Sequence, residues 1–428
     1  MKKAISFPIN NFIDFRSKML NWVQPFNIFC LLDNRQYHFE TPAFECLLAV
    51  GCKRKMEAGE GDTFELLKAF SKDQKDWIFG HLGYDLKNEL APLHSSNYDG
   101  INFPDAFFFV PEIVVQLKEH EVIICCESSA GDIFSAIESS AIVIEKASPK
   151  VIEIQRRVSP EAYIETIKKI QQHILRGDCY EVNFCQEFFA QGASINPFTV
   201  YSSLVTLSPN PFSSLYRLND QFCICASPER YFKKSGAKIF SQPIKGTAKR
   251  NLSNPEQDES SKLALLNSEK EKSENVMVVD LVRNDLSRVC KSGSVRVDEL
   301  FGIYSFPQVH QMISTISGEL EKGLDWVDVV KATFPMGSMT GAPKRRVLEL
   351  IEQYESTKRG LFSGAIGYVN PQGDADFNVV IRSILYNAAS QYLSFQTGSA
   401  ITFYSNAVEE YEECMLKATA MQQVLQQP

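Results

Sequence analysis

The chain has 428 residues, of which 44% are hydrophobic and 22% charged, a composition typical of a folded globular protein with a large core. A formal net charge of −8 gives no basic field, so we expect no nucleic-acid partner, and any anionic ligand must be bound by local positive charges. No apolar run approaches the ~18 residues of a membrane span, and no signal peptide is recognised, so we expect no membrane association and a cytoplasmic location. The eleven cysteines form no CxxC pair, which favours reduced thiols acting as small hydrophobic residues.

The beginning of the chain contains short β-rich segments separated by loops. Residues 26–32 (FNIFCLL), 105–110 (DAFFFV) and 121–126 (EVIICC) are predicted strands. A junction near residue 150 precedes a predicted helix. We therefore assign residues 1–145 to an N-terminal region and residues 150–428 to a larger second region.

The predicted helix after the junction has clear start and stop signals. Ser159 is a good N-cap, Pro160 suits the first helical position, and Gly177 ends the segment. Four isoleucines at helical spacing predict its buried face: Ile164, Ile167, Ile170 and Ile174. Residues 179–191 (CYEVNFCQEFFAQ) have strand character.

The middle of the chain predicts a hairpin followed by a long helix. Residues 222–242 alternate apolar runs around a turn at Ser235-Gly236. Lys245 then lies just past a strand end, where its side chain can face a cavity; a surface lysine in a turn is the alternative. One long helix is predicted over 260–289. Later predicted elements are strands within 364–369, 377–386 and 392–405 and a closing helix at 407–426.

Two predicted helices carry glutamates at i, i+3 spacing, Glu271 with Glu274 and Glu410 with Glu413. This spacing places both carboxylates of a pair on one helix face. Two such faces brought together would suit Mg²⁺, which takes one or two direct carboxylates and keeps several waters. Two solvated acidic faces are the alternative, and an ion pair of Glu413 with Lys417 would fit it.

Three further segments are informative before any family is considered. Residues 334–346 (FPMGSMTGAPKRR) form a glycine-rich loop entering a helix, which offers N–H groups to an anion but is not a Walker A loop. His310 is a lone histidine that could be a core residue. Arg382 interrupts an apolar strand and needs a carboxylate from the protein or from a ligand.

Taken in order, the motifs resemble the signature series of the chorismate-utilising enzymes. The resemblance spans roughly residues 160–420. The segments that carry it are SPERY, PIKGT, EKEKSENVMVVDLVRND, VHQMIS, GSMTGAPK, GAIGYV, VVIRS and EYEECMLKA. The earlier segment GHLGYDLKNEL shows a weaker similarity to the family. Within that family the series is most similar to component I of the aminodeoxychorismate (para-aminobenzoate) synthases. The resemblance implies an α+β fold of two packed antiparallel β-sheets flanked by helices.

The resemblance also implies a reaction. Ammonia would replace the C4 hydroxyl of chorismate, giving 4-amino-4-deoxychorismate for para-aminobenzoate and folate synthesis. Lys245 would attack C2, Glu229 would protonate the leaving hydroxyl, and His310 matches an active-site histidine of the family. Mg²⁺ would bind Glu274 and Glu413, with Glu271 and Glu410 behind them.

The remaining expectations concern substrate and partner. Arg382 with Tyr368 would bind a carboxylate of chorismate, and Thr340, Gly398 and Lys417 would complete the substrate site. The sequence shows no glutaminase segment, so a separate glutamine amidotransferase subunit (component II) would supply the ammonia.

Alternatives within and outside this chemistry stay open. Anthranilate synthases carry alanine at the position of Lys245, and isochorismate and salicylate synthases carry a water-activating lysine at the position of Glu181. A non-catalytic chorismate-binding or partner-binding subunit is the alternative of a different class. The chain departs from the family pattern at Met336 and Ala400, where glycine is usual, and at Glu181, where glutamine is frequent.

Overall fold

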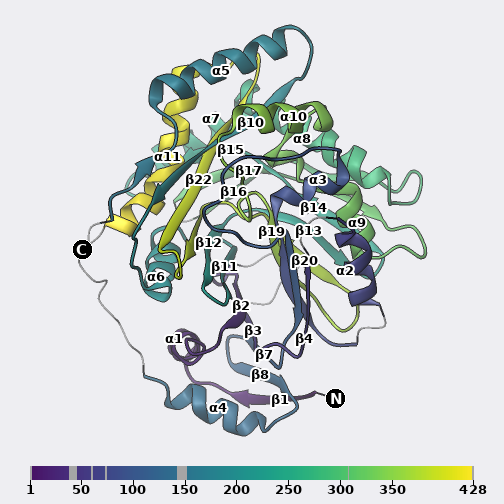
Figure 1. Cartoon of the computed structure of the whole chain (residues 1–428), viewed down its shortest axis with the longest axis vertical. Helices are drawn as coiled ribbons and strands as arrows, with labels where there is room; N and C mark the ends of the chain where they lie inside the picture. The colour runs from purple at the N-terminus through teal and green to yellow at the C-terminus, as the bar shows by residue number, and fades with distance from the viewer. Residues whose placement is uncertain are drawn as a thin grey trace.

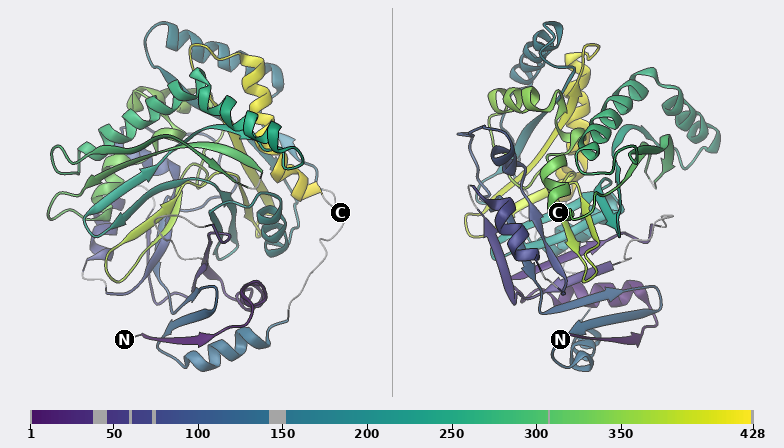
Figure 2. Two further views of the ribbon diagram at one scale, coloured as in Figure 1. Left: turned by 180° about the vertical axis from the view of Figure 1, so that it is seen from behind. Right: turned by 90° about the vertical axis from the view of Figure 1, so that its right-hand side faces the viewer.

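The computed structural model describes residues 2–37, 46–58, 61–72, 75–141, 152–306 and 308–426. Within these residues two antiparallel sheets pack against each other and helices cover their outer faces (Figures 1 and 2). This is the predicted α+β architecture. The proposed junction at 145–150 lies outside the described residues.

The first sheet has the strand order β1-β8-β7-β3-β2-β11-β12-β21-β22-β10-β18, and β9 also pairs with β10. Its strands are β1 (Lys3–Pro8), β2 (Ile28–Asp33), β3 (Cys46–Val50), β7 (Ile113–Leu117), β8 (Glu121–Cys126), β9 (Gln155–Arg156), β10 (Glu181–Ala190), β11 (Phe212–Leu218), β12 (Gln221–Ser227), β18 (Gly341–Ala342), β21 (Ser383–Asn387) and β22 (Tyr392–Ile401).

The second sheet has the order β15-β17-β14-β13-β20-β19-β5-β6-β4, and β16 also pairs with β17. Each sheet joins a block of strands from before residue 150 to a block from after it, through the pair β2–β11 in the first sheet and β5–β19 in the second. Its strands are β4 (Arg54–Ala58), β5 (Ile78–Leu82), β6 (Ala106–Val110), β13 (Arg230–Ser235), β14 (Lys238–Gln242), β15 (Ile244–Lys249), β16 (Arg296–Ser305), β17 (Val309–Glu319), β19 (Ala365–Val369) and β20 (Ala375–Asn378).

Strand β6 illustrates how side chains alternate between two apolar layers. Phe107 lies opposite His81 of β5, which bonds Tyr216 of the first sheet, so this face points between the sheets. Phe108 points the other way, with its ring 5.4 Å from that of Trp326 on a covering helix. Side chains on both faces of β6 are therefore buried, which explains why its residues, AFFFV, are all apolar.

The helices divide between the two outer faces. Helices α1, α4, α6 and α11 contribute apolar residues to the core outside the first sheet, whereas α2, α8 and α9 pack at the second sheet. In Figure 1, α5 and α11 lie at one end of the molecule and β1 with α4 at the other. The helices are α1 (Phe12–Trp22), α2 (Thr63–Ser71), α3 (Lys87–Leu90), α4 (Ala130–Ser139), α5 (Pro160–Leu175), α6 (Pro197–Leu207), α7 (Pro255–Asn267), α8 (Glu269–Ser287), α9 (Trp326–Thr333), α10 (Lys344–Tyr354) and α11 (Ala407–Gln426), with 3₁₀ turns η1 (Tyr84–Leu86) and η2 (Gly337–Met339).

Several local predictions are confirmed. Ser159 caps α5 by accepting a hydrogen bond from the Ala162 amide at 3.2 Å, and α11 covers the predicted range 407–426. The turn at Ser235-Gly236 joins β13 to β14 as an antiparallel hairpin. The predicted strands near 26–32, 105–110 and 121–126 are β2, β6 and β8.

Two local predictions are wrong, and a third is incomplete. The single helix predicted over 260–289 is two helices, because the Ser268 side chain accepts a hydrogen bond from the Glu271 amide and caps a new helix, α8. The strand predicted over 377–386 is two strands in different sheets, joined by residues 379–382. Lys245 does follow the end of β14 at Gln242, but it lies within a further strand, β15, that was not predicted.

The interior also accounts for the cysteines. All eleven are free thiols and ten of them are buried, in keeping with a role as small apolar side chains. Among the described helices none has both the length and the apolar character to cross a membrane.

Candidate active site

Two crossovers between the sheets carry Glu229 and Arg382. The chain leaves β12 at Ser227 and enters the second sheet at Arg230, and it returns from β20 to β21 through residues 379–382. The two crossovers lie side by side, because the Val379 amide donates to the Glu229 carbonyl at 3.0 Å and the Ala226 amide to the Arg382 carbonyl at 3.1 Å. The fold therefore brings together two residues that are about 150 positions apart.

Lys245 projects from a bulge in β15. Ile244 pairs with Ile313 and Thr247 with Gln311, so β15 has one extra residue here, and Gly246 takes a φ of 94°. A bulge bends the strand and redirects its side chains. The Lys245 side chain, 9% exposed, donates from Nζ to Glu181 Oε1 at 2.7 Å, so the contact joins the second sheet to the first.

The surroundings of Lys245 are strongly acidic. Burial acts to lower the pKa of Lys245, but the carboxylates of Glu181, Glu274 and Glu229 outweigh it and raise the pKa above its ordinary value. Lys245 is therefore a cation in the unliganded protein. A lysine must lose its proton before it can act as a nucleophile.

Glu229 is poised to exchange a proton near neutral pH. Burial raises the pKa of Glu229 to about 7, although the Ser338 hydroxyl and Lys245 both act to lower it. The Ser338 hydroxyl donates to Glu229 Oε1 at 2.7 Å. A carboxyl group with a pKa close to the working pH is well suited to general acid catalysis.

The two glutamate pairs predicted from the sequence come together around Lys270. Lys270 Nζ lies 3.4 Å from Glu410 Oε1 on α11 and 4.0 Å from Glu274 Oε1 on its own helix, α8. Burial raises the pKa of Glu274 to about 7, and it also raises the pKa of Glu271. Burial would raise the pKa of Glu413 too, but Lys417, paired with it at 2.7 Å, and Lys270 lower it.

This acidic cluster suits Mg²⁺ by the chemistry of its donors. In the described part of the chain no three His, Cys, Asp or Glu side chains stand ready to hold a metal ion together. Mg²⁺ needs only one or two direct carboxylates, however, and Glu274 Oε1 is a buried oxygen that makes no hydrogen bond among the described residues. Lys270 and Lys417 provide the countercharge in this arrangement.

The glycine-rich loop is fixed against strand β10. The carbonyl of Thr340 accepts a hydrogen bond from the Asn183 amide at 2.7 Å, and the Asn183 side chain donates to the Ser338 carbonyl at 3.3 Å. Thr340 itself is fully buried, and its hydroxyl donates to the Met336 carbonyl at 3.0 Å. The loop that bears Ser338, the partner of Glu229, therefore depends on β10 for its position.

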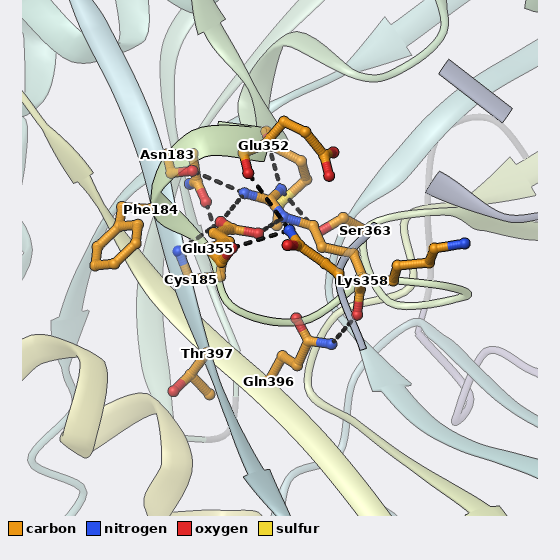
Figure 3. Close-up of polar contacts among 12 residues, drawn as sticks. Asn183, Phe184, Cys185, Glu352, Glu355, Lys358, Ser363, Gln396 and Thr397 are labelled. Carbon is orange, nitrogen blue, oxygen red and sulfur yellow. Dashed lines mark hydrogen bonds and ion pairs between the residues drawn. The ribbon is translucent and has the colours of Figure 1, made fainter. Parts of the chain in front are cut away.

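A buried ion pair supports both of these elements. Figure 3 shows Glu355 with Asn183 and Cys185 of β10 around it. Arg359 Nη2 donates to Glu355 Oε1 at 2.6 Å and to the Asn183 carbonyl at 2.8 Å, and Nη1 donates to the Met339 carbonyl at 2.7 Å. The Cys185 amide donates to Glu355 Oε1 at 2.9 Å. Arg359 thus links the loop, β10 and the end of α10.

Arg382 has the properties of an anion-binding group. Among the described residues no hydrogen bond or ion pair engages its guanidinium, and burial lowers its pKa. Its φ of 49° is in the left-handed region, which is uncommon for a residue other than glycine. Backbone strain of this kind is found at functional sites more than elsewhere.

The other predicted site residues fall into two groups. Lys417 Nζ donates to the Gly398 carbonyl at 3.1 Å, and Gly398 has no room for a side chain because a Cβ would lie 2.0 Å from the Phe184 carbonyl oxygen. His310 lies on β17 opposite Ala248 of β15, and Tyr368 lies on β19. The ring of His310 contacts Ser305 Oγ at 2.8 Å and Asp258 Oδ1 at 3.2 Å. Tyr368 lines a different cavity, with its ring 5.5 Å from that of Trp77.

The structure adds residues that the sequence did not assign to the site. Glu181 was recognised only as a departure from the family pattern, yet it makes the direct contact with Lys245. Ser338 lies in a recognised motif, and Lys270 is one residue before Glu271. Asn183 and Arg359 had no sequence signal, because their contacts depend on elements far apart in the chain.

Comparison with known proteins agrees with this geometry. The family model of the chorismate binding enzymes matches residues 28–423. Aminodeoxychorismate synthase component 1 of Bacillus subtilis is 33% identical over 369 residues, covering 83% of this chain and 78% of that protein. Anthranilate synthase component 1 of Cereibacter sphaeroides is 30% identical over 420 residues, covering 91% and 81%. The crystal structure of anthranilate synthase component I from Streptococcus pneumoniae superposes with a TM-score of 0.78 at 26% identity, covering 90% of this chain and 94% of that one. The protein belongs to the chorismate binding enzyme family and acts on chorismate.

Proposed function

We propose that the protein aminates chorismate at C4 with ammonia and forms 4-amino-4-deoxychorismate. The observation that carries this proposal is that the buried side chain of Lys245 lies close enough to Glu229, a potential acid with a pKa of about 7, for each to shift the pKa of the other. By resemblance, a lysine at this position belongs to the aminodeoxychorismate synthases. The similarity to aminodeoxychorismate synthase component 1 supports the same reading.

The proposed reaction assigns one task to each group. Arg382 binds a substrate carboxylate, for which a planar guanidinium is well shaped. The neutral amine of Lys245 attacks C2, the ring double bonds shift, and the C4–O bond breaks. Glu229 donates its proton to the departing oxygen, which leaves as water. Ammonia then attacks C4, the double bonds shift back, and Lys245 is released from C2.

Magnesium is part of this proposal. Glu274 and Glu413 would hold the ion, with Glu271 and Glu410 behind them, and it would bind the ring carboxylate of chorismate. Among the protein's own groups, Glu229 keeps its proton at the C4 hydroxyl until that group leaves.

The ammonia would come from a partner subunit. The relatives are named as component 1, which supports a second component, and we propose a glutamine amidotransferase in that role. We further propose that both act in the cytoplasm, in the synthesis of para-aminobenzoate and folate.

Anthranilate synthesis is the second candidate, because anthranilate synthases are also among the similar proteins. The two reactions differ in their products. Amination at C4 keeps the enolpyruvyl group, whereas anthranilate formation releases pyruvate and an aromatic amine. Lys245 argues for the first, since by resemblance the second has alanine there.

Product analysis tests the proposal. The purified chain is incubated with chorismate, Mg²⁺ and ammonium, and the products are identified by mass spectrometry. We expect aminodeoxychorismate, with no turnover when glutamine replaces ammonium. Anthranilate with pyruvate, or isochorismate, would identify one of the other reactions, and binding of chorismate without turnover would indicate a non-catalytic subunit.

A further inference from the structure

A cavity beside Glu229 has no task in the proposed reaction. Glu229 and Ser338 both line it, and the Ser338 hydroxyl donates to Glu229 Oε1 at 2.7 Å. Helices α8 and α9 form another part of its wall. Of the described residues that line it, none is Lys245 or one of the four glutamates assigned to Mg²⁺. The cavity therefore adjoins the acid of the proposed reaction but is distinct from the nucleophile and the acidic cluster.

The second half of α8 forms one side of this cavity. Val282, Asp285 and Leu286 line it, about two to three helical turns beyond the last glutamate that α8 gives to the acidic cluster. Lys344 Nζ donates to Asp285 Oδ2 at 2.6 Å and to the carbonyl of Thr333 at 2.9 Å. Because Thr333 lines the cavity from α9, Lys344 ties the two helices together at this wall.

The lining of the cavity suits a small neutral molecule better than an ion. Val282, Leu286 and Met336 are apolar, and the carboxylate of Asp285 is already paired with Lys344. The space between the side chains is enough for about one molecule of the size of water. Ammonia has that size and carries no charge, whereas an ammonium ion would lose its hydration against apolar walls.

The other sides of the substrate are engaged in the proposed reaction. Lys245 forms the bond to C2, Arg382 binds one carboxylate, and the acidic cluster is assigned to the ring carboxylate. Glu229 is the group assigned to the C4 hydroxyl, and the cavity adjoins Glu229. A nucleophile held in the cavity is therefore beside the carbon that it must attack, and it can occupy that place while chorismate is bound.

We propose that this cavity is the ammonia site of the enzyme, from which ammonia attacks C4. The inference rests on the proposed function, because that function makes C4 the carbon that receives the amine. The lone pair of ammonia forms the C4–N bond, the double bonds shift back, and the bond from C2 to Lys245 breaks, so that Lys245 leaves as a neutral amine. The new ammonium group at C4 then returns one proton to the Glu229 carboxylate, and no further reactant is needed.

Filling the cavity tests the proposal. Val282 lines the cavity and is only partly buried, so Val282→Phe can place a ring there. The purified chain is assayed with chorismate, Mg²⁺ and varied ammonium, without a partner subunit. We expect kcat/KM for ammonium to fall by about tenfold or more, because ammonia loses its held position beside C4. The value of kcat/KM for chorismate should be unchanged, and so should the rate at which the Lys245 peptide gains the mass of the substrate adduct when ammonium is left out.

Two further variants make the result decisive. Val282→Leu adds less volume to the cavity and should give a smaller fall in kcat/KM for ammonium, which also tests the idea if the phenylalanine variant does not fold. Ser287→Phe adds the same ring to an exposed position of α8 and should leave the kinetics of both substrates unchanged.

Contrary outcomes are distinguishable. A wild-type value of kcat/KM for ammonium in Val282→Phe would overturn the ammonia site and leave the proposed function standing. An equal fall in adduct formation would also overturn it, because the ring would then act through Glu229 and not through ammonia. Wild-type protein that makes no aminodeoxychorismate from ammonium would overturn the proposed function and this inference together.

Discussion

Two buried charge clusters contact strand β10, and they differ in how completely their charges are matched. At Arg359 the guanidinium donates to both oxygens of Glu355, and its other hydrogen bonds go to two backbone carbonyls and the Ser363 hydroxyl. At Lys245 one ammonium interacts with the carboxylates of Glu181, Glu229 and Glu274, and of these three Glu274 also has Lys270 within 4.0 Å. In the Lys245 cluster, Glu181 Oε2 and Glu274 Oε1 are buried and accept no hydrogen bond from any residue that the structure describes.

The difference separates a structural role from a chemical one. A buried ion pair whose partners are all satisfied resists change, because removing either partner leaves an isolated charge. A cluster with surplus negative charge is costly in the free protein and gains from a ligand, a metal ion or a proton that completes it. The Arg359 cluster therefore holds the loop and β10 in place, and the Lys245 cluster is where protons can move.

Replacing Lys245 by arginine is the strongest test of whether the Lys245 cluster has a chemical role. The guanidinium keeps the positive charge but stays protonated and cannot attack C2. We expect the amination rate to fall by about 10³-fold or more, the scale seen when a covalent nucleophile is lost. Steady-state assays with ammonium measure the amination rate, and the same substitution at the exposed Lys238, Lys238→Arg, is the control. An amination rate of Lys245→Arg close to that of the wild type would show that Lys245 only binds a carboxylate.

A second test addresses the matched cluster. Replacing Glu355 by glutamine leaves Arg359 as a buried cation without its counterion, so the free energy of unfolding should fall by about 3 to 5 kcal/mol. Urea denaturation of the variant and the wild type measures the change. A loss below about 1 kcal/mol, the usual size for an exposed pair, would mean that Arg359 is not the anchor that its contacts indicate.

The pH dependence of the reaction examines Glu229. Because its pKa is raised to about 7 and its protonated form is required, kcat should be highest below pH 7 and should fall about tenfold per pH unit above it. Glu229→Gln should lower kcat by about 10²-fold and abolish this decline. We would measure kcat of both proteins between pH 5.5 and 9, a range chosen to bracket the pKa of Glu229. If kcat of Glu229→Gln still fell with rising pH as in the wild type, the decline would belong to another group.

The smallest effect on stability is expected at Glu274, and its sign is the opposite of that at Glu355. Glu274→Gln removes one of the surplus carboxylates, so the free energy of unfolding at pH 7 without metal should rise by about 1 kcal/mol. In the same variant, activity with Mg²⁺ should be lost and calorimetric Mg²⁺ binding weakened. A marked loss of stability would show that Glu274 is needed by the fold, and undiminished Mg²⁺ binding would place the ion elsewhere.

The architecture that the family resemblance implied is confirmed, whereas the acidic and basic site residues stay predictions, and their contacts could not be foreseen from the sequence. Local signals sufficed where one element determined the outcome, as for the cap of α5 at Ser159 or the range of α11. They failed at the crossovers, since the apolar run around Arg382 has the same pattern whether it forms one strand or two. Glu181 and Arg359 could not be assigned roles, because their partners Lys245 and Met339 come from other elements.

The pairing of early strands with late strands has a consequence for synthesis of the protein on the ribosome. Leu82 of β5 pairs with Ala365 of β19, so the second sheet cannot close until about 280 further residues have been made. At typical elongation rates this leaves the apolar edge of β5 without its partner for roughly 15 to 60 s. Strand edges of this kind are prone to aggregate, and pairing over such sequence distances is intrinsically slow. The nascent chain therefore depends on protection of β5 and β6, and the yield of active protein should respond to chaperone supply and growth temperature more than its final stability suggests.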